Sequence, residues 1–404
     1  ANPMSPDDRD SFGYNLAQVQ YMRSNMTASA FFQRGYGWYR LDGRQYGLDG
    51  LLLGTMLTYS TPHANYGVHV NEFRRDHTRD DYGNYGTKGE TNAFAKFTWD
   101  TSRWHFYSDN QIRTTDFHYH GDVAIDPIRW TFFNPKIGAR YRNFYASAGV
   151  SRREPTRTDL FQGEDNATFA HDLHAVHPER LIDVEAGWDV HTTRGSISSN
   201  VYVMDFHNEI AATGELSNIG LPLRRNVDRS YRRGIEVDGS WQIAPTVRWR
   251  GNANLSRNRI HQWTQFYDVY DAGGNIVGSR PVTYFNVNPI LTPNVILNQA
   301  IEYTPSPRWS VGAVARYVGR SYLDNTNNNA FTTPAFVVVD ATASMGVWRS
   351  TRLMLQVNNL LNRRRVFPSG YSYLFFTPAG AIDGVSYFYP QATRNALVTL
   401  RVNL

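Results

Sequence analysis

The chain has 404 residues and a formal net charge of +5, with 25 tyrosines, 22 phenylalanines, 10 tryptophans and no cysteine. Without cysteine it has neither a disulfide framework nor a thiolate metal site. Its basic residues are dispersed rather than gathered in one stripe, which argues against a nucleic-acid partner. No stretch approaches the roughly 18 consecutive apolar residues of a membrane-spanning helix, so the α-helical membrane class is excluded.

Segments of about ten residues, in which apolar and polar side chains alternate, recur along the chain. In chain order they include a first strand near residues 12–22, followed by NAFAKFTWD, LIDVEAGWDVH, RRGIEVDGSWQI, TRLMLQVN and the terminal NALVTLRVNL. In the last segment Ala396, Val398, Leu400, Val402 and Leu404 form the apolar set. Because successive side chains of a strand point to opposite faces, each segment predicts a strand with one apolar face. About ten residues suffice for a tilted strand to cross a bilayer.

The predicted connections alternate between short and long. Short turns are expected near Ser24, Pro62, Thr101, Arg142, Arg194, Pro245, Ser306 and Arg349, and long polar connections at about 37–49, 77–90, 118–131, 154–180, 209–230, 261–290, 320–334 and 362–390. Eight long loops would be unusual in a compact soluble domain. Outer-membrane barrels, in contrast, have short periplasmic turns and long extracellular loops. Six tryptophans fall near the short-turn ends, where an aromatic girdle would lie: Trp99, Trp104, Trp188, Trp241, Trp309 and Trp348.

These patterns predict an all-β fold, a transmembrane antiparallel β-barrel whose apolar face meets lipid and whose polar face lines a wet interior. A soluble sandwich would need equally short turns at both ends, and a propeller or solenoid would show a sequence repeat, which is absent. Eight hairpins and the terminal segment give 17 strands. Because single-chain bacterial barrels have an even number of strands, we expect an odd number of N-terminal strands to lie outside this sequence. An odd-stranded barrel is the alternative. The start of the sequence shows no signal peptide, so we expect that one was removed or that the natural beginning lies upstream.

Several segments resemble the TonB-dependent outer-membrane receptors. They are SRREPTRTDLF, HPERLIDVEAGWD, VYVMDFHNEI, RRGIEVDGSW, VNNLLN and the terminal strand, in the order that the family shows. The resemblance implies a barrel of 22 strands preceded by a plug, so that residues 1–404 would be a barrel domain lacking the plug and about five strands. Such barrels commonly end in phenylalanine, and Leu404 departs from that pattern.

The resemblance also implies a function. It predicts a bacterial outer-membrane protein, not an enzyme, that imports a scarce large solute, most often a ferric siderophore, driven by TonB–ExbB–ExbD acting through the plug. A passive porin and a haem or metal receptor remain alternatives, as does a barrel enzyme or adhesin. We expect contacts with outer-membrane lipid and lipopolysaccharide, a monomer, and neither a cofactor nor a nucleic-acid partner.

Candidate ligand contacts lie near the long connections. Tyr36, Trp38 and Tyr39 could stack on a siderophore or haem, or pack in a girdle. Arg364 and Arg365 could attract an anionic chelate or remain solvated.

The histidines form two groups. His118 and His120 share one face of a strand end. His171, His174 and His177 are three residues apart and would approach one another on a helix, as a metal or haem-iron site requires. Ordinary polar loop histidines are the alternative for both groups.

Carboxylates on the predicted polar faces do not indicate catalysis. Lumen walls are polar, and such groups are expected to pair with neighbouring arginines or with the plug: Glu185, Asp189, Glu236 and Asp238. No serine and histidine motif indicates a hydrolase.

Overall fold

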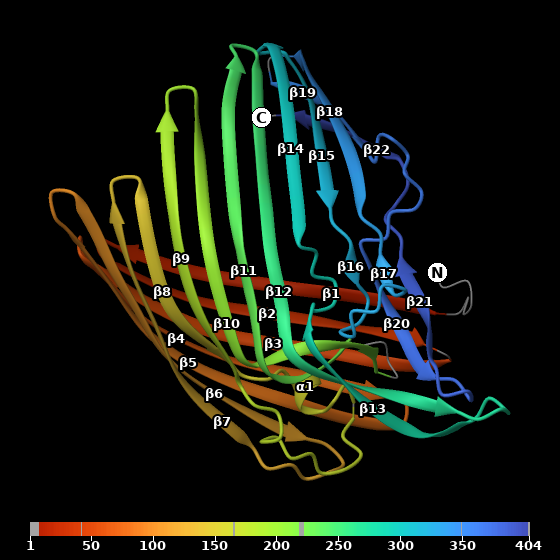
Figure 1. Cartoon of the computed structure of the whole chain (residues 1–404). Coiled ribbons are helices and arrows are strands. Elements are labelled where there is room, and N and C mark those ends of the chain that lie inside the picture. Colours follow the sequence, from red (N-terminus) through yellow and green to blue (C-terminus); the bar gives the residue numbers. More distant parts are fainter. Residues whose placement is uncertain (1–7, 42, 165, 218–221, 349, 403–404) are drawn as a thin grey trace.

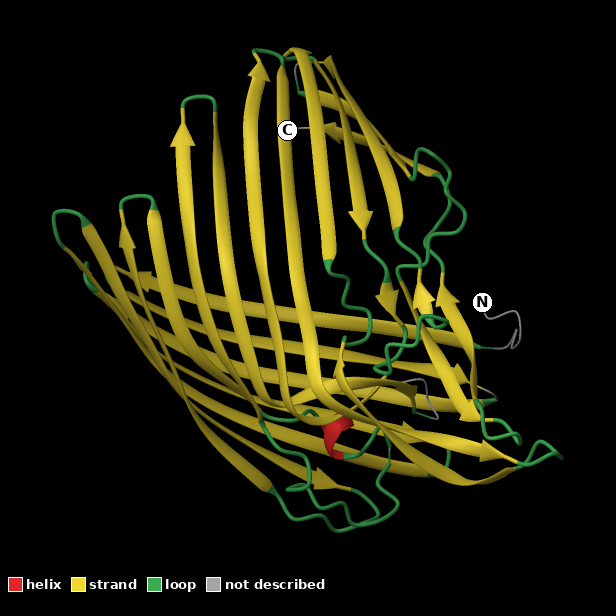
Figure 2. Ribbon diagram, in the orientation of Figure 1, coloured by secondary structure: helices red, strands yellow, loops and turns green. Residues whose placement is uncertain are grey.

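The computed structural model describes residues 8–41, 43–164, 166–217, 222–348 and 350–402. These residues form strands joined by turns and loops, with one helix of four residues (Figure 2). No helix in the described part of the chain is long and apolar enough to cross a membrane.

The elements follow one another in chain order (Figure 1). They are β1 (Arg9–Arg23), β2 (Met26–Leu41), β3 (Arg44–Ser60), β4 (Ala64–Arg79), β5 (Tyr82–Asp100), β6 (Trp104–His120), β7 (Ile128–Tyr141), β8 (Phe144–Arg153), α1 (Arg157–Leu160), β9 (Glu179–Thr192), β10 (Gly195–Leu216), β11 (Pro222–Ala244), β12 (Val247–Tyr270), β13 (Ile276–Val287), β14 (Val295–Ser306), β15 (Trp309–Val318), β16 (Ser321–Tyr322), β17 (Thr332–Thr333), β18 (Phe336–Trp348), β19 (Thr351–Asn358), β20 (Ser369–Phe376), β21 (Ile382–Tyr389) and β22 (Asn395–Val402).

Seventeen of the described strands form one antiparallel wall that curls around an interior. The wall runs from β1 to β12 in order and continues through β14, β15, β18, β19 and β22. This confirms the predicted all-β fold and the predicted number of strands. The eight short connections also lie where they were expected, although Arg349 and Leu404 are outside the described residues. β1 and β22 run in the same direction, and no ladder joins them in the part of the chain that is described.

Several of the predicted long connections consist mostly of paired strands. Residues 37–49 and 77–90 do so because Leu41 of β2 pairs with Arg44 of β3 and Arg79 of β4 pairs with Tyr82 of β5. The predicted connection at 209–230 likewise lies mostly in β10 and β11, which pair with each other up to Leu216 and Pro222. Polar side chains continue the two-residue alternation beyond the apolar region, and backbone pairing does not need an apolar face. The connections at 261–290 and 362–390 likewise contain β13, β20 and β21.

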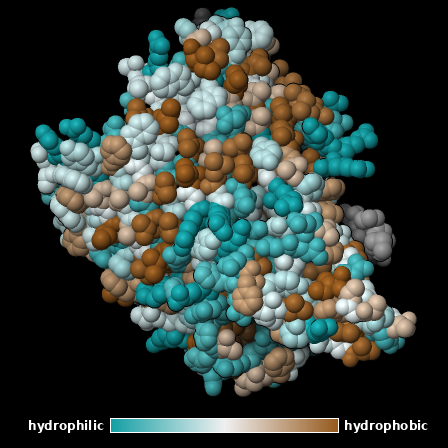
Figure 3. All heavy atoms as spheres, viewed as in Figure 1, coloured by the Kyte–Doolittle hydropathy of each residue, from teal (hydrophilic) through white to brown (hydrophobic). Residues whose placement is uncertain are grey.

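The outer face of the wall carries an apolar belt near the short turns. On β9 this belt includes Val184 and Trp188, and the register continues it to Val201 on β10 and Ile235 on β11. Figure 3 shows apolar patches over the middle of these strands and hydrophilic surface gathered below them, toward the loops. The six predicted tryptophans lie within a few residues of short turns, and Trp348 is 80% exposed. The belt therefore provides the surface that lipid would cover.

The loop between β8 and β9 lies on the inner face. Arg157 donates a hydrogen bond to Asn84 of β5 at 2.6 Å, and Asp159 approaches Arg224 of β11 at 3.7 Å. A segment that contacts strands so far apart in the wall must cross its concave side (Figure 2). Side chains that face this loop, such as Phe117 and Tyr119, therefore point inward.

The VNNLLN segment ends β19 in a turn held by Asn359. This residue is fully buried and has a φ of 50°. Its side-chain amide donates to the carbonyl of Arg363 at 2.8 Å and accepts from the Arg363 amide at 2.9 Å, and its backbone amide donates to Asp340 at 2.7 Å. Asparagine tolerates the left-handed conformation and can bond the backbone locally, which explains its place here.

Candidate functional site

A buried carboxylate fastens the inner loop to the wall. Glu154, immediately after β8, accepts hydrogen bonds from Arg113 at 2.6 and 2.7 Å and pairs with Lys88. Arg113 also donates to Glu90 at 2.7 Å. Burial alone would raise the pKa of Glu154, but the hydrogen bonds from Arg113 and Lys88 outweigh it and hold the pKa at about 2. The carboxylate therefore stays ionised and the loop stays anchored.

The same loop is held by a small hydrophobic cluster. Thr156 caps α1 in a reciprocal capping box with Asp159, which sets the direction of the following residues. Phe161 is fully buried and packs edge-on against Phe117 and Tyr119, with ring centroids 5.9 and 5.0 Å apart. The loop thus has both ionic and apolar contacts with β5 and β6.

A cavity of about 620 Å³ remains between the anchored loop and the inner face of β1–β7. Its aromatic and aliphatic lining consists of Phe12, Tyr39, Leu48, Phe73, Phe117 and Trp130. Its basic lining consists of Arg75, His77, Lys88 and Arg157. The loop closes one side of the cavity with residues 154–158 and Glu164. We call this space the inner cavity. Apolar walls with a few placed polar groups are the usual composition of a small-molecule site.

Arg75 is a cation of the inner cavity that has no charge partner. Its side chain forms neither a hydrogen bond nor an ion pair with any described residue, whereas Lys88 is paired with Glu154. The neighbouring Arg74 faces outward, bonds Asp76 at 2.7 and 3.1 Å and lies over the Tyr85 ring. The inner cavity can therefore offer a free guanidinium to an anionic group.

The three aromatic residues predicted to bind ligand do not share one face. Tyr39 lines the inner cavity and stacks on Tyr46 with ring centroids 4.7 Å apart. Tyr36 and Trp38 alternate with it and take the opposite face, where they are 45% and 37% exposed. Only Tyr39 is thus placed to meet a ligand in the inner cavity.

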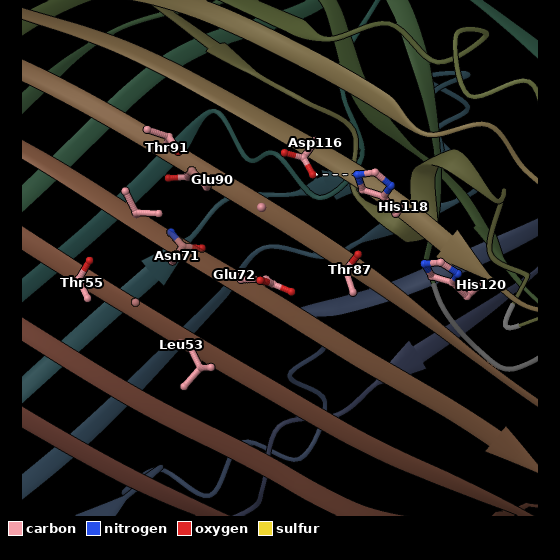
Figure 4. A pocket seen from close by; sticks show the side chains of 13 residues that line it. Leu53, Thr55, Asn71, Glu72, Thr87, Glu90, Thr91, Asp116, His118 and His120 are labelled. Carbon is pink, nitrogen blue, oxygen red and sulfur yellow. Dashed lines mark hydrogen bonds and ion pairs between the residues drawn. The ribbon is translucent and has the colours of Figure 1, made fainter.

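His118 and His120 also face outward. They alternate with Phe117 and Tyr119, and the register places them opposite Thr87 and Tyr85. Figure 4 shows both histidines in a shallow groove on this outer face, with His118 beside Asp116 at 3.1 Å. They do not reach the inner cavity.

The segment with His171, His174 and His177 is not helical, so the spacing argument for a metal site fails. His171 is nearly buried, lies 3.2 Å from Glu164 and packs on Phe169 and Phe161, whereas His174 and His177 are exposed. In the described part of the chain, no group of three or more histidines and carboxylates could hold a metal ion.

Arg364 and Arg365 are exposed after the Asn359 turn and do not line the inner cavity. Their ligand contact stays a prediction. Asp189, on the inner wall, pairs with Arg140 at 2.7 Å, as was expected. Glu185, Glu236 and Asp238 form no ion pair with a described residue, and Glu236 instead accepts a hydrogen bond from Asn254 at 2.8 Å.

Sequence reasoning missed Arg75, Lys88 and Glu154. Lys88 and Glu154 lay in the predicted long connections at 77–90 and 154–180, and Arg75, just before the first of these ranges, carried no sign of a binding role. The one available sign was the Thr156 to Asp159 spacing, which is typical of a helix start.

The model of the family described as TonB dependent receptor-like, beta-barrel matches residues 4–360. The chain belongs to this family. Its members are outer-membrane receptors and transporters rather than enzymes, so the chain is a bacterial outer-membrane β-barrel and the enzyme and porin alternatives are not supported. No curated protein sequence matches the chain.

Solved structures show the same fold. The closed form of the ferric-catecholate import receptor Fiu from Escherichia coli K12 is 16% identical, with a TM-score of 0.67, over 98% of this chain and 65% of that chain. The copper transporter OprC is 14% identical, with a TM-score of 0.70, over 98% and 66%. The ferric yersiniabactin uptake receptor FyuA from Yersinia pestis is 13% identical, with a TM-score of 0.67, over 98% and 61%. The TonB-dependent receptor barrel described here thus spans somewhat less than two thirds of these receptors.

Proposed function

We propose that this chain is the barrel of a receptor that imports a ferric siderophore across the outer membrane with energy delivered by TonB. Fiu and FyuA, which share its fold, are receptors for ferric chelates. The observation that carries the proposal is the inner cavity, which combines aromatic walls with the unpaired Arg75. Aromatic rings suit the flat ligand groups of a chelate, and a guanidinium suits its negative charge.

The proposal places the chelate between Tyr39, Phe73 and Arg75. A siderophore complex commonly carries excess negative charge, which a free guanidinium stabilises through charge-assisted hydrogen bonds. Tyr39 would contribute a ring face, and the anchored loop would shield the complex from water. The receptor is proposed to act through a plug and TonB–ExbB–ExbD, and as a monomer.

The test uses the full-length receptor and a panel of ferric catecholate, phenolate and hydroxamate chelates, with haem and copper as further probes. Binding is followed by tryptophan fluorescence, because Trp130 lines the inner cavity. We expect Arg75→Gln to weaken binding of an anionic chelate by about tenfold to a hundredfold. Arg74→Gln, one residue away on the outer face, is the matched control and should leave binding unchanged.

Uptake of radioactive iron from the bound chelate should stop when the proton motive force is collapsed. Uptake that survives collapse would indicate passive diffusion and contradict the proposal. Equal binding of the chelate by the Arg75→Gln and Arg74→Gln variants would show that the chelate does not bind in the inner cavity.

A further inference from the structure

Two glycines on the inner face of β2 and β3 each lie under a phenylalanine ring of the neighbouring strand. Gly37 of β2 is opposite Phe12 of β1, and Gly54 of β3 is opposite Phe31 of β2. A Cβ added at either glycine would overlap the ring of its partner. The missing side chain therefore lets an aromatic ring lie directly on the strand backbone.

Gly35 and Gly50 differ from these two glycines. They lie opposite each other on β2 and β3, and both share the inner face with Tyr39. A Cβ at Gly35 would have no heavy atom within 4 Å, and a Cβ at Gly50 would make ordinary contact with Phe73 at 3.5 Å. Neither glycine has a positive φ. Because glycine weakens a strand interior, a pair that neither packing nor backbone conformation requires indicates close approach of another group.

Large side chains border this pair. Tyr14 of β1 lies opposite Gly35 and Arg75 of β4 lies opposite Gly50, so the four positions form one row across the wall. Two residues from Arg75 on the same face, Phe73 provides a ring. Neighbouring strands are about 4.8 Å apart, so the two glycines form a floor roughly 10 Å wide. A floor of this width accommodates a planar six-membered ring.

The space above this floor is a cavity of about 450 Å³, which we call the glycine slot. It shares Phe12, Leu48, Phe73 and Arg75 with the inner cavity, so the two spaces adjoin. Arg75 is the only charged residue among the described residues that line the slot. A ligand whose charged part meets Arg75 can therefore extend an uncharged arm into the slot.

We propose that the glycine slot binds a planar aryl arm of the chelate, so that the receptor selects ferric chelates with aryl arms over anionic chelates without a ring. This inference rests on the proposed function of the inner cavity. The ring would lie over Gly35 as the Phe12 ring lies over Gly37. Tyr14, which is 71% exposed, and Phe73 would contact it from two sides. The negative charge of the chelate would remain at Arg75.

The test fills the glycine slot in the full-length receptor. Gly35→Val places a branched side chain in open space, and such residues suit strands, so unfolding in denaturant should match the wild type. Binding of a ferric tris-catecholate, followed by quenching of tryptophan fluorescence, should weaken by about tenfold or more. Gly35→Ala fills less of the slot and should weaken binding less.

Gly278→Val is the matched control. Gly278 lies in β13, and a Cβ added there also has no heavy atom within 4 Å. This variant should bind the catecholate like the wild type. Ferric citrate, an anionic chelate without a ring, should bind the wild type more weakly than the catecholate does. Equal affinity of the wild type for both chelates would overturn the proposal, as would an equal loss of both, or of neither, in Gly35→Val.

These outcomes are distinct from a failure of the proposed function. If no ferric chelate binds, or if Arg75→Gln binds the catecholate like the wild type, the chelate is not held in the inner cavity and the glycine slot has no role. If binding depends on Arg75 but not on Gly35, the inner cavity remains the binding site and the glycine slot alone is excluded.

Discussion

The inner face of the wall is covered differently over β1–β6 and over β10–β13. Along β1–β6, the inner cavity stays open below the anchored loop, and Phe73 and Arg75 face free space. Along β10–β13, folded loops fill the corresponding space, and Trp263 and Tyr267 are at most 1% exposed. The strands of both sides have the same alternation, so the difference comes from the connections.

The largest effect is expected on the filled side. Trp263 packs against Ile260 and Val287, and Trp263→Ala should destabilise the receptor by about 3–5 kcal/mol, as large-to-small changes of buried aromatics do. Phe73→Ala is the matched change on the open side and should cost clearly less, since Phe73 is half-buried. Denaturant unfolding of both variants checks this. Equal losses would show that the two sides do not differ in packing.

A pH titration should test whether the ion pairs of Glu154 hold the loop that follows it against the wall. The folded pKa of Glu154, about 2, is below the ordinary value of 4.5, so its ion pairs stabilise the loop above about pH 4.5. This stabilisation, at most about 3 kcal/mol, is lost as the pH falls from 4.5 toward 2. Hydrogen exchange of residues 155–164 should therefore accelerate over that window in the wild type. Glu154→Gln should exchange rapidly already at neutral pH, and a loop with unchanged protection would contradict the anchoring role.

A smaller effect is expected from replacing Asn325, whose side chain hydrogen-bonds two other segments over β10–β13. Its side chain is fully buried, donates to the carbonyl of Ala212 at 2.8 Å and accepts from the amide of Ile290 at 2.9 Å. Asn325→Ala would leave both backbone groups unpaired, at a cost of about 1–3 kcal/mol. Proteolysis within residues 319–335 should become faster. Asn328→Ala in the same loop keeps these two bonds and is the control.

The strands could be predicted because lipid imposes a simple rule. A residue such as Val237 must be apolar and Glu236 can be polar, so the period of two is visible in the sequence. The rule ends where the membrane ends. Beyond it, Lys88 still belongs to a paired strand, but the sequence of residues 77–90 has the composition of a loop, which is why this range was wrongly predicted as a connection.

The candidate site could be predicted only in part. Tyr39 was named together with Tyr36 and Trp38, since the composition of GYGWYRL indicates aromatics but not the face that each one takes. That face depends on how the strands pair, and residues 37–49 had been predicted as a loop instead of paired strands. The contact of Glu154 with Arg113 joins residues 41 positions apart and has no local signature. Long-range pairs of this kind follow from the register of the wall.

The tight connections between β2 and β3 and between β4 and β5 determine which parts of the rim of the barrel can change shape. Backbone hydrogen bonds brace β2–β5 up to these connections, so this part of the entrance has a fixed height and cannot fold over a solute. Capture of a solute at the inner cavity would then depend on residues 154–178. A single crosslink between this segment and β5 would hold the entrance in one state.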